Sequence, residues 1–213
     1  MARNARVVLP NYPHHVTQRG NRKQTTFFNR HDYKYYLNVM AKLCCHHQVE
    51  IWAYCLMPNH VHMVAVPSAE DGLSRAIGEA HRCYALKVNQ REGWRGHLWQ
   101  ERFASFVMDQ TYLLAAARYV ELNPVRAGLV DRPEDYQWSS ASAHLRGRDD
   151  TLVSVKPMLD MVDSWDKYLE IEDSAGYDRL RKHEKTGRPL GTAAFIEKLE
   201  VITGRKLRPQ RVR

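Results

Sequence analysis

The sequence predicts an α+β fold, in which an antiparallel sheet carries helices on one face and a small helical extension follows at the carboxyl end. Two kinds of segment alternate along the chain: stretches rich in β-branched and aromatic residues, and stretches whose apolar residues recur at helical spacing. Two strand-like stretches within residues 49–66 are separated by a tight turn, which predicts a hairpin. The resulting order is β-α-β-β-α-β, as a ferredoxin-like sheet requires.

Each element has its own signal. Asn29 precedes apolar residues at helical spacing and is a good cap for the first helix, because its side chain can accept the free amide protons of the first turn. The residues around Trp52 favour strands by composition. The predicted elements, in chain order, are a strand over 7–19, a helix over 29–47, the hairpin over 49–66, a helix over 73–89 and a strand over 96–107.

The carboxyl-terminal part of the chain reads as an extension. The polar stretch 146–150 marks a boundary between a first domain over 1–150 and an extension over 151–213 with two or three short helices. In the last of these helices, Thr192 is the cap and Gly204 the stop. The final residues, 205–213, form a basic run. This run is expected to grip phosphates, to lie over the functional face of the first domain, or to be a solvated tail.

The hairpin carries the most informative pair of residues, His60 and His62. Side chains in a strand alternate between the two faces, so these two imidazoles project from one face while Val61 points to the other. Two imidazoles on one rigid face can share a divalent cation. A His-x-His pair seen alone is more often an ordinary part of a half-buried sheet.

A helix begins after Asp109, which can cap it, and should end near Asn123, because Pro124 disfavours the helical conformation in the residue before it. Tyr119 and Asn123 lie about 40° apart around this helix. Placed against the histidines, they would supply a nucleophilic hydroxyl and an oxygen ligand for a metal, as a phosphodiester transesterification needs. The plainer alternative is a packed tyrosine and a capping asparagine.

Five motifs in a fixed order carry a resemblance that extends over about residues 7–145. The sequence resembles the single-tyrosine HUH transposases, and most of all their branch of tyrosine transposases associated with repeated extragenic palindromes (REPs). The motifs are Tyr12-Pro-His-His-Val-Thr-Gln-Arg-Gly-Asn21, Met57-Pro-Asn-His-Val-His62, Leu98-Trp-Gln-Glu-Arg-Phe103, Tyr119-Val-Glu-Leu-Asn-Pro-Val-Arg-Ala-Gly-Leu-Val130 and Tyr136-Gln-Trp-Ser-Ser140.

The resemblance implies an RRM-like catalytic domain that cuts and rejoins single-stranded DNA through a 5′-phosphotyrosine link. It implies that His60 and His62 bind a divalent metal, Mg²⁺ or Mn²⁺, and that Tyr119 is the nucleophile. Asn123 takes the position where relatives place a third metal ligand, often glutamine, which is longer by one methylene. The expected substrate is DNA with a hairpin, as in the REPs, and the protein is expected to act as a monomer or a homodimer.

Composition agrees with a nucleic-acid partner. The chain has a formal net charge of +8 and a pI of about 9.4, which suits a polyanion but does not prove that one is bound. No apolar run has the length of a signal peptide core or a membrane span, so a soluble protein of the bacterial cytoplasm, associated with the nucleoid, is expected. Further candidates for DNA contact are Arg19, Arg22, Lys23, Trp99, Arg102, Arg118 and Arg126. For Trp99, packing in the core is the better interpretation.

Two other functions remain open at this point. The first is a different HUH nuclease role, such as replication initiation, with the same chemistry on another substrate. The second is a catalytically inactive, domesticated protein that binds hairpin DNA. A covalent protein–DNA adduct separates the enzyme from the binder.

Overall fold

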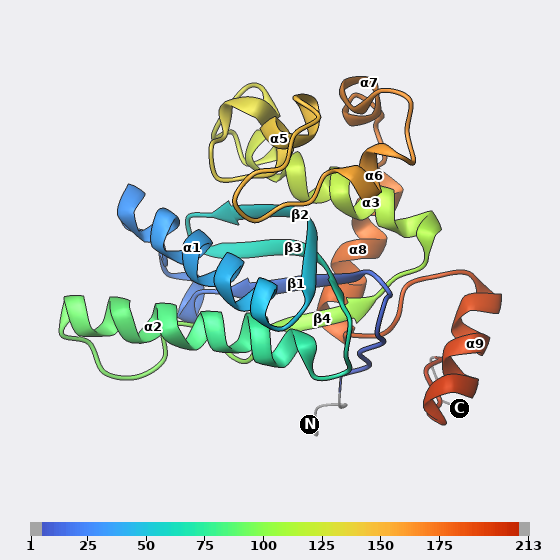
Figure 1. Ribbon diagram of the computed structural model, residues 1–213, viewed down its shortest axis with the longest axis horizontal. Coiled ribbons are helices and arrows are strands. Elements are labelled where there is room, and N and C mark those ends of the chain that lie inside the picture. The colour runs from blue at the N-terminus through green and yellow to red at the C-terminus, as the bar shows by residue number, and fades with distance from the viewer. Residues whose placement is uncertain (1–5, 209–213) are drawn as a thin grey trace.

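The computed structural model describes residues 6–208 and is built around a four-stranded antiparallel sheet (Figure 1). The strands lie in the order β2-β3-β1-β4. None of the helices in the described part of the chain is long and apolar enough to pass through a membrane. The strand bounds are β1 His14–Arg19, β2 Val49–Met57, β3 His60–Pro67 and β4 Ala104–Val107.

One face of the sheet is covered by helices α1 (Arg30–His46) and α2 (Glu79–Glu92), as predicted (Figure 1). The side chain of Asn29 accepts hydrogen bonds from two amides of the first turn of α1, so the predicted cap is confirmed. A π-helical turn over Ser74–Gly78 precedes α2. The apolar side chains of this layer pack on strand residues such as Val61 and Met63 to form the larger core cluster.

The opposite face of the sheet is also covered, by α3 (Gln110–Glu121) and α8 (Ser174–Thr186). The side chain of Asp109 accepts a hydrogen bond from the amide of Tyr112, which confirms the predicted cap of α3. Helix α3 contacts β2 and β3, and α8 contacts α3 and β4. The predicted extension therefore supplies part of the cover on this face.

The register of the sheet decides which side chains face α3 and α8. In β3, His60 and His62 lie opposite Arg19 and Thr17 of β1, and directly opposed residues in an antiparallel pair share a face. His62 belongs to the face covered by α3, whereas Val61 belongs to the face covered by α1. The prediction that the two histidines share one face is confirmed.

Two predicted strands are longer than the observed ones. The first strand starts at His14 and not at residue 7, since Pro10 and Pro13 lack the amide protons that a central strand needs. The last strand starts at Ala104 and not at residue 96. Residues 96–103 form an irregular segment instead, with Gly96 at a φ of 99° and a single bridge between Trp99 and Gly20.

The remaining described elements are short, apart from the last helix, which begins after its cap Thr192 and stops at Thr203, with Gly204 as its C-cap, as predicted. They pack around the α3 side of the sheet and at its edges (Figure 1). The basic run 205–213 lies partly outside the described residues. Within them, Arg208 pairs with Glu197 and Glu200 of the last helix. These elements are η1 Asn21–Lys23, α4 Asn123–Arg126, η3 Pro133–Asp135, α5 Ala141–Leu145, α6 Lys156–Leu159, α7 Trp165–Leu169 and α9 Ala193–Thr203.

Candidate active site

A cavity of about 500 Å³ opens between the sheet and the two helices α3 and α8. Strands β1 and β3 form its floor, α3 and α8 supply one side, and the irregular segment before β4 supplies the other. The residues that line it are Thr17, Gln18, Arg19, His60, His62, Gln100, Glu101, Arg102, Ala104, Tyr119, Arg181, Glu184 and Lys185.

His60 and His62 lie side by side in this cavity, with ring centroids 5.0 Å apart and planes at 82°. The Nδ1 atom of His60 is 2.6 Å from Oδ1 of Asn59, which can only accept, so Nδ1 carries the proton and Nε2 keeps its lone pair. Burial lowers the pKa of His60 to about 4 and lowers the pKa of His62 well below the usual value. Both rings are therefore neutral at pH 7, the form that binds metal ions.

Two further residues, His15 and Glu184, join the pair. Nε2 of His15 is 3.2 Å from Nδ1 of His62, and Oε1 of Glu184 is 3.4 Å from the same atom. Nδ1 of His15 and Oε1 of Glu184 are both buried without a hydrogen-bond partner. One ligand atom from each of His15, His62 and Glu184 lies within 4.8 Å of the others, so these three residues could hold a metal ion.

Sequence reasoning did not find His15 or Glu184 as site residues. His15 stands in the first of the five motifs that carry the resemblance. It lies two residues before Thr17 in β1, and Thr17 is directly opposite His62, so His15 is on the face of His62. Glu184 carries no local signal, because only the packing of α8 against the sheet brings it to the histidines.

Tyr119 projects from α3 into the same cavity and is 6% exposed. Its ring centroid is 5.6 Å from that of His62, with the planes at 85°. Burial raises the pKa of the phenol and the nearby Glu184 carboxylate adds to the rise, whereas Arg181 and Arg126 lower it. The hydroxyl is thus held beside the histidines in its protonated form.

Cations surround the tyrosine. The Arg126 guanidinium lies over its ring, 4.3 Å from the centroid, and donates a hydrogen bond of 2.7 Å to its backbone carbonyl. The same guanidinium lies 4.7 Å from the ring centroid of Tyr177 on α8. Arg19 and Arg181 line the cavity from β1 and α8. The site can therefore attract and orient a phosphate group.

The structure places Asn123 at the start of α4, outside the residues that line the cavity. Its Nδ2 atom is buried and has no hydrogen-bond partner among the described residues. The third-ligand role of Asn123 stays a prediction.

The other candidates for DNA contact fall into two groups. Arg22 and Lys23 are exposed on η1, and Arg102 is exposed at the rim of the cavity. The other two are packed inside the protein. Trp99 is 7% exposed and donates its indole N–H to the backbone of His81, while Arg118 is 4% exposed and pairs with Asp173 at 2.9 Å.

Comparison with known proteins agrees with this geometry. The model of the family described as "Transposase IS200 like" matches residues 9–123, which include both histidines and the tyrosine. A Haemophilus influenzae protein described as a REP-associated tyrosine transposase is 26% identical over 108 residues, 46% of this chain and 61% of its own length. This chain thus spans less than two thirds of that relative.

Among solved structures, that of a REP-associated tyrosine transposase bound to a REP hairpin superposes with a TM-score of 0.59. It is 19% identical, and the match covers 72% of this chain and 92% of that one. At this identity the similarity shows the fold alone, which is the same α+β arrangement with a four-stranded antiparallel sheet. The family match covers more than half of the chain, so this protein belongs to the IS200-like transposases.

Proposed function

We propose that this protein is a metal-dependent, single-tyrosine DNA strand transferase that cuts and rejoins single-stranded DNA next to a hairpin. The observation that carries the proposal is the meeting of Tyr119 with His62 and His60 in one cationic cavity. An inactive binding protein would not need a hydroxyl packed against a neutral histidine pair.

The chemistry follows from the position of Tyr119. Its phenol oxygen attacks the phosphorus of a phosphodiester, a bond forms between oxygen and phosphorus, and the bond from phosphorus to the 3′ oxygen breaks. The protein is left with a 5′-phosphotyrosine link, the phenol proton is lost, and the 3′ oxygen gains a proton. Attack of a 3′ hydroxyl on this link reverses the step and joins two strands. Arg126 and Arg181 lie where they stabilise the negative charge that develops on the phenol oxygen.

The residues present fit a divalent cation. His60 has a free Nε2, and His62 has Nδ1 beside the Glu184 carboxylate, an arrangement that orients a ligating imidazole. We propose His60 and His62 as ligands with Asn123 as the third, and we place His15 and Glu184 beside them as further ligands or as partners that orient His62. A bound Mg²⁺ or Mn²⁺ would polarise the phosphate and ease ionisation of the phenol.

The substrate is proposed from the relatives and the charge of the chain. The solved relative is bound to a REP hairpin, and the formal net charge of this chain is +8. Arg19 and Arg102 line the cavity, and Arg22 and Lys23 are exposed on η1, which follows β1. These four residues are the proposed phosphate contacts.

The test is a denaturing gel for a covalent protein–DNA adduct with single-stranded hairpins from the neighbouring genomic DNA. Wild-type protein is expected to form the adduct with Mg²⁺ or Mn²⁺ and to lose it in excess chelator, while hairpin affinity changes only a few-fold. Tyr119→Phe removes the attacking oxygen and should abolish the adduct. Tyr112→Phe, on the same helix and partly exposed, is the matched control and should react normally.

Adduct formation by Tyr119→Phe at the wild-type rate would show that another residue is the nucleophile. Full activity in chelator would rule out the metal. Hairpin binding without any adduct in wild-type protein would favour the inactive DNA-binding protein.

A further inference from the structure

Three side chains from three separate elements converge at the candidate active site: His15 of β1, His62 of β3 and Glu184 of α8. Oε1 of Glu184 is 3.4 Å from Nδ1 of His62 and 3.8 Å from Nδ1 of His15. Two atoms bound to one zinc ion in a tetrahedral site lie about 3.3–3.6 Å apart, because each bond is about 2.0–2.2 Å long. The observed spacing is close to that of ligands on one ion.

Two of these atoms lack hydrogen-bond partners within the described part of the chain. They are Nδ1 of His15 and Oε1 of Glu184, and both are buried. Burial also lowers the pKa of His15 to about 3, so its ring is neutral at pH 7 and carries no charge to pair with Glu184. A buried polar atom without a partner costs free energy, and a cation between the three side chains removes this cost.

The ligand atoms of this group favour zinc over magnesium. Two imidazole nitrogens and one carboxylate oxygen are a common set of zinc ligands in proteins, with a fourth position left for water. Magnesium prefers six oxygen ligands and keeps several of its waters. An ion can reach the group from the active-site cavity, because His62 and Glu184 both line it and the Glu184 side chain is 19% exposed.

His62 belongs both to this group and to the pair with His60, and it cannot serve both at once. A neutral imidazole has one nitrogen with a lone pair and one nitrogen with a proton. When Nδ1 of His62 carries the proton, next to the Glu184 carboxylate, Nε2 is free to bind a metal together with His60. When Nδ1 itself binds an ion, Nε2 carries the proton, and the pair with His60 loses a ligand.

We propose that His15, His62 and Glu184 form a second metal site, which takes a zinc ion and competes for His62 with the ion of the His60–His62 pair. The ligand atoms are Nδ1 of His15, Nδ1 of His62 and Oε1 of Glu184. Zinc in this site ties α8 to β1 and β3, so it stabilises the packing of this helix on the sheet. The binding of zinc depends on these three residues alone, whereas the competition rests on the proposed function.

Thermal unfolding of the full chain without DNA tests the zinc site. Zinc chloride at about a hundredfold excess over its dissociation constant should raise the melting temperature by about 5 °C. The same concentration of magnesium chloride should have no effect. Glu184→Gln and His15→Gln each remove a ligand and should abolish the zinc shift. His60→Gln leaves all three ligands in place and should keep the shift, which separates this site from the His60–His62 pair.

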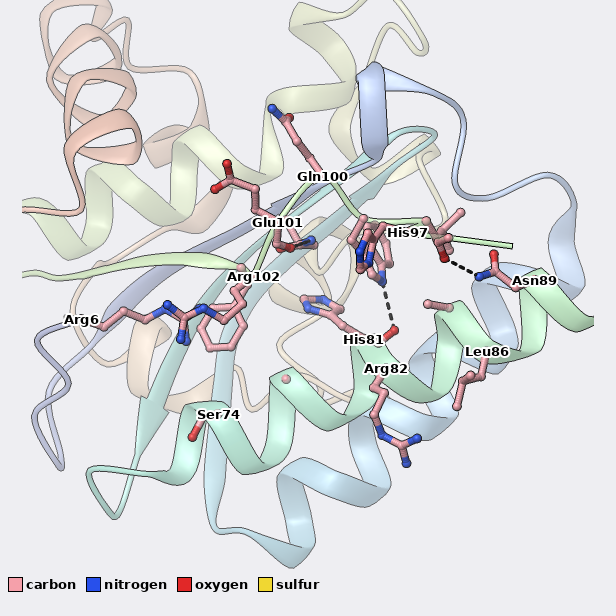
Figure 2. Close-up of a pocket in the computed structure, with 17 residues that line it drawn as sticks. Arg6, Ser74, His81, Arg82, Leu86, Asn89, His97, Gln100, Glu101 and Arg102 are labelled. Carbon is pink, nitrogen blue, oxygen red and sulfur yellow. Dashed lines mark hydrogen bonds between the residues drawn. The ribbon is translucent and has the colours of Figure 1, made fainter. Parts of the chain in front are cut away.

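Glu101→Gln is the matched control, because Glu101 lines the same cavity but lies outside the ligand group. It stands between Gln100 and Arg102 on the segment that precedes β4 (Figure 2), and its removal should leave the zinc shift unchanged. Cys45→Ser is a second control, since the exposed thiol of Cys45 is another group that can bind zinc. The inference is wrong if wild-type protein shows no zinc shift, if either ligand variant keeps it, or if a control variant loses it.

The adduct gel with Mn²⁺ tests the competition. Zinc that fills the second site should slow adduct formation by wild-type protein about tenfold, because the His60–His62 pair loses a ligand. Glu184→Gln, compared with its own rate without zinc, should lose this sensitivity, and Glu101→Gln should keep it. Equal inhibition of Glu184→Gln and wild type would show that zinc acts elsewhere. If wild-type protein forms no adduct without zinc, the proposed function fails, whereas the zinc shift in melting temperature is unaffected.

Discussion

Glu121 is fully buried two residues beyond Tyr119 on α3, and its carboxylate is surrounded by donors. One oxygen accepts from the hydroxyl of Ser140 and is 2.6 Å from Nδ1 of His144, and the other accepts a 2.8 Å hydrogen bond from the indole of Trp165. Buried carboxylates with this many partners fix the element that carries them. Glu121 therefore holds the end of α3 that presents Tyr119.

We predict that Glu121→Gln lowers the free energy of unfolding by about 1–3 kcal/mol, because the amide nitrogen replaces an acceptor that faces a donor. The covalent step should slow as Tyr119 loses its fixed position. Urea unfolding and the adduct gel measure the two effects. Glu70→Gln, at an exposed carboxylate, is the control. An unchanged unfolding midpoint for Glu121→Gln would contradict this account of the network.

The individual site residues differ in whether their role can be predicted from the sequence. His60 and His62 could be paired from their spacing, and Tyr119 from its place on a capped helix, because both relations lie within one element. To predict His15 as a site residue, one must know the register between β1 and β3, and to predict Glu184, one must know how α8 packs on the sheet. Neither follows from local spacing.

At the scale of elements, α8 is the helix that closes the site. Leu180 of α8 is fully buried against the α3 layer, and Glu184, one turn later, reaches His62. Tyr177 packs on Tyr119 with ring centroids 5.4 Å apart. The helix thus supplies the carboxylate and part of the tyrosine's packing together.

We predict that Glu184→Gln weakens metal-dependent adduct formation about 10–100-fold with little change in hairpin affinity, because carboxylates next to ligating histidines support metal binding to this extent. Adduct rates over a Mn²⁺ titration measure it, with the exposed Glu172→Gln as control. Faster adduct formation by Glu184→Gln would show instead that this carboxylate restrains the site.

Element boundaries show where local signals fail. The caps at Asn29, Asp109 and Thr192 were predicted and are present, because a cap needs only its own first turn. The strand ends were wrong by several residues at 7–13 and 96–103, because strand pairing depends on a partner that is distant in sequence.

At the scale of the whole molecule, the part of the chain beyond residue 150 contributes to the central packing. Trp165, Leu180 and Leu190 are buried in the same cluster as Phe106 and Leu113. Composition could not predict this packing, because the apolar stripe of a short helix does not show which surface the helix packs against. Removal of residues after 150 would expose this cluster, so the role of the carboxyl-terminal residues is better tested by point substitutions than by truncation.

The whole molecule should also lose stability in mild acid. Burial lowers the pKa of His81 to about 3, and the nearby charge of Arg6 adds to this, so the folded protein keeps the ring neutral. The unfolded chain takes up the proton near pH 6.5. The contribution of His81 is therefore fully present above about pH 6.5 and is lost as the pH falls towards 3.

We predict that the free energy of unfolding falls by about 1 kcal/mol from this residue between pH 7 and pH 5.5. Urea unfolding in chelator at the two pH values gives the difference. His81→Gln should show a smaller decline, and His31→Gln, at an exposed histidine, should decline like wild type. Equal declines for His81→Gln and wild type would mean that His81 does not carry this sensitivity.

The contact of Glu184 with His15 and His62 determines when the candidate site is completed during synthesis of the chain. Synthesis proceeds from the amino end, and folding units form as they emerge from the ribosome. A nascent chain that has released β1, β3 and α3 already contains the histidines and Tyr119, but the carboxylate beside them arrives only with α8. The candidate site is therefore completed among the last contacts of the chain to form, after the strands and α3 have left the ribosome.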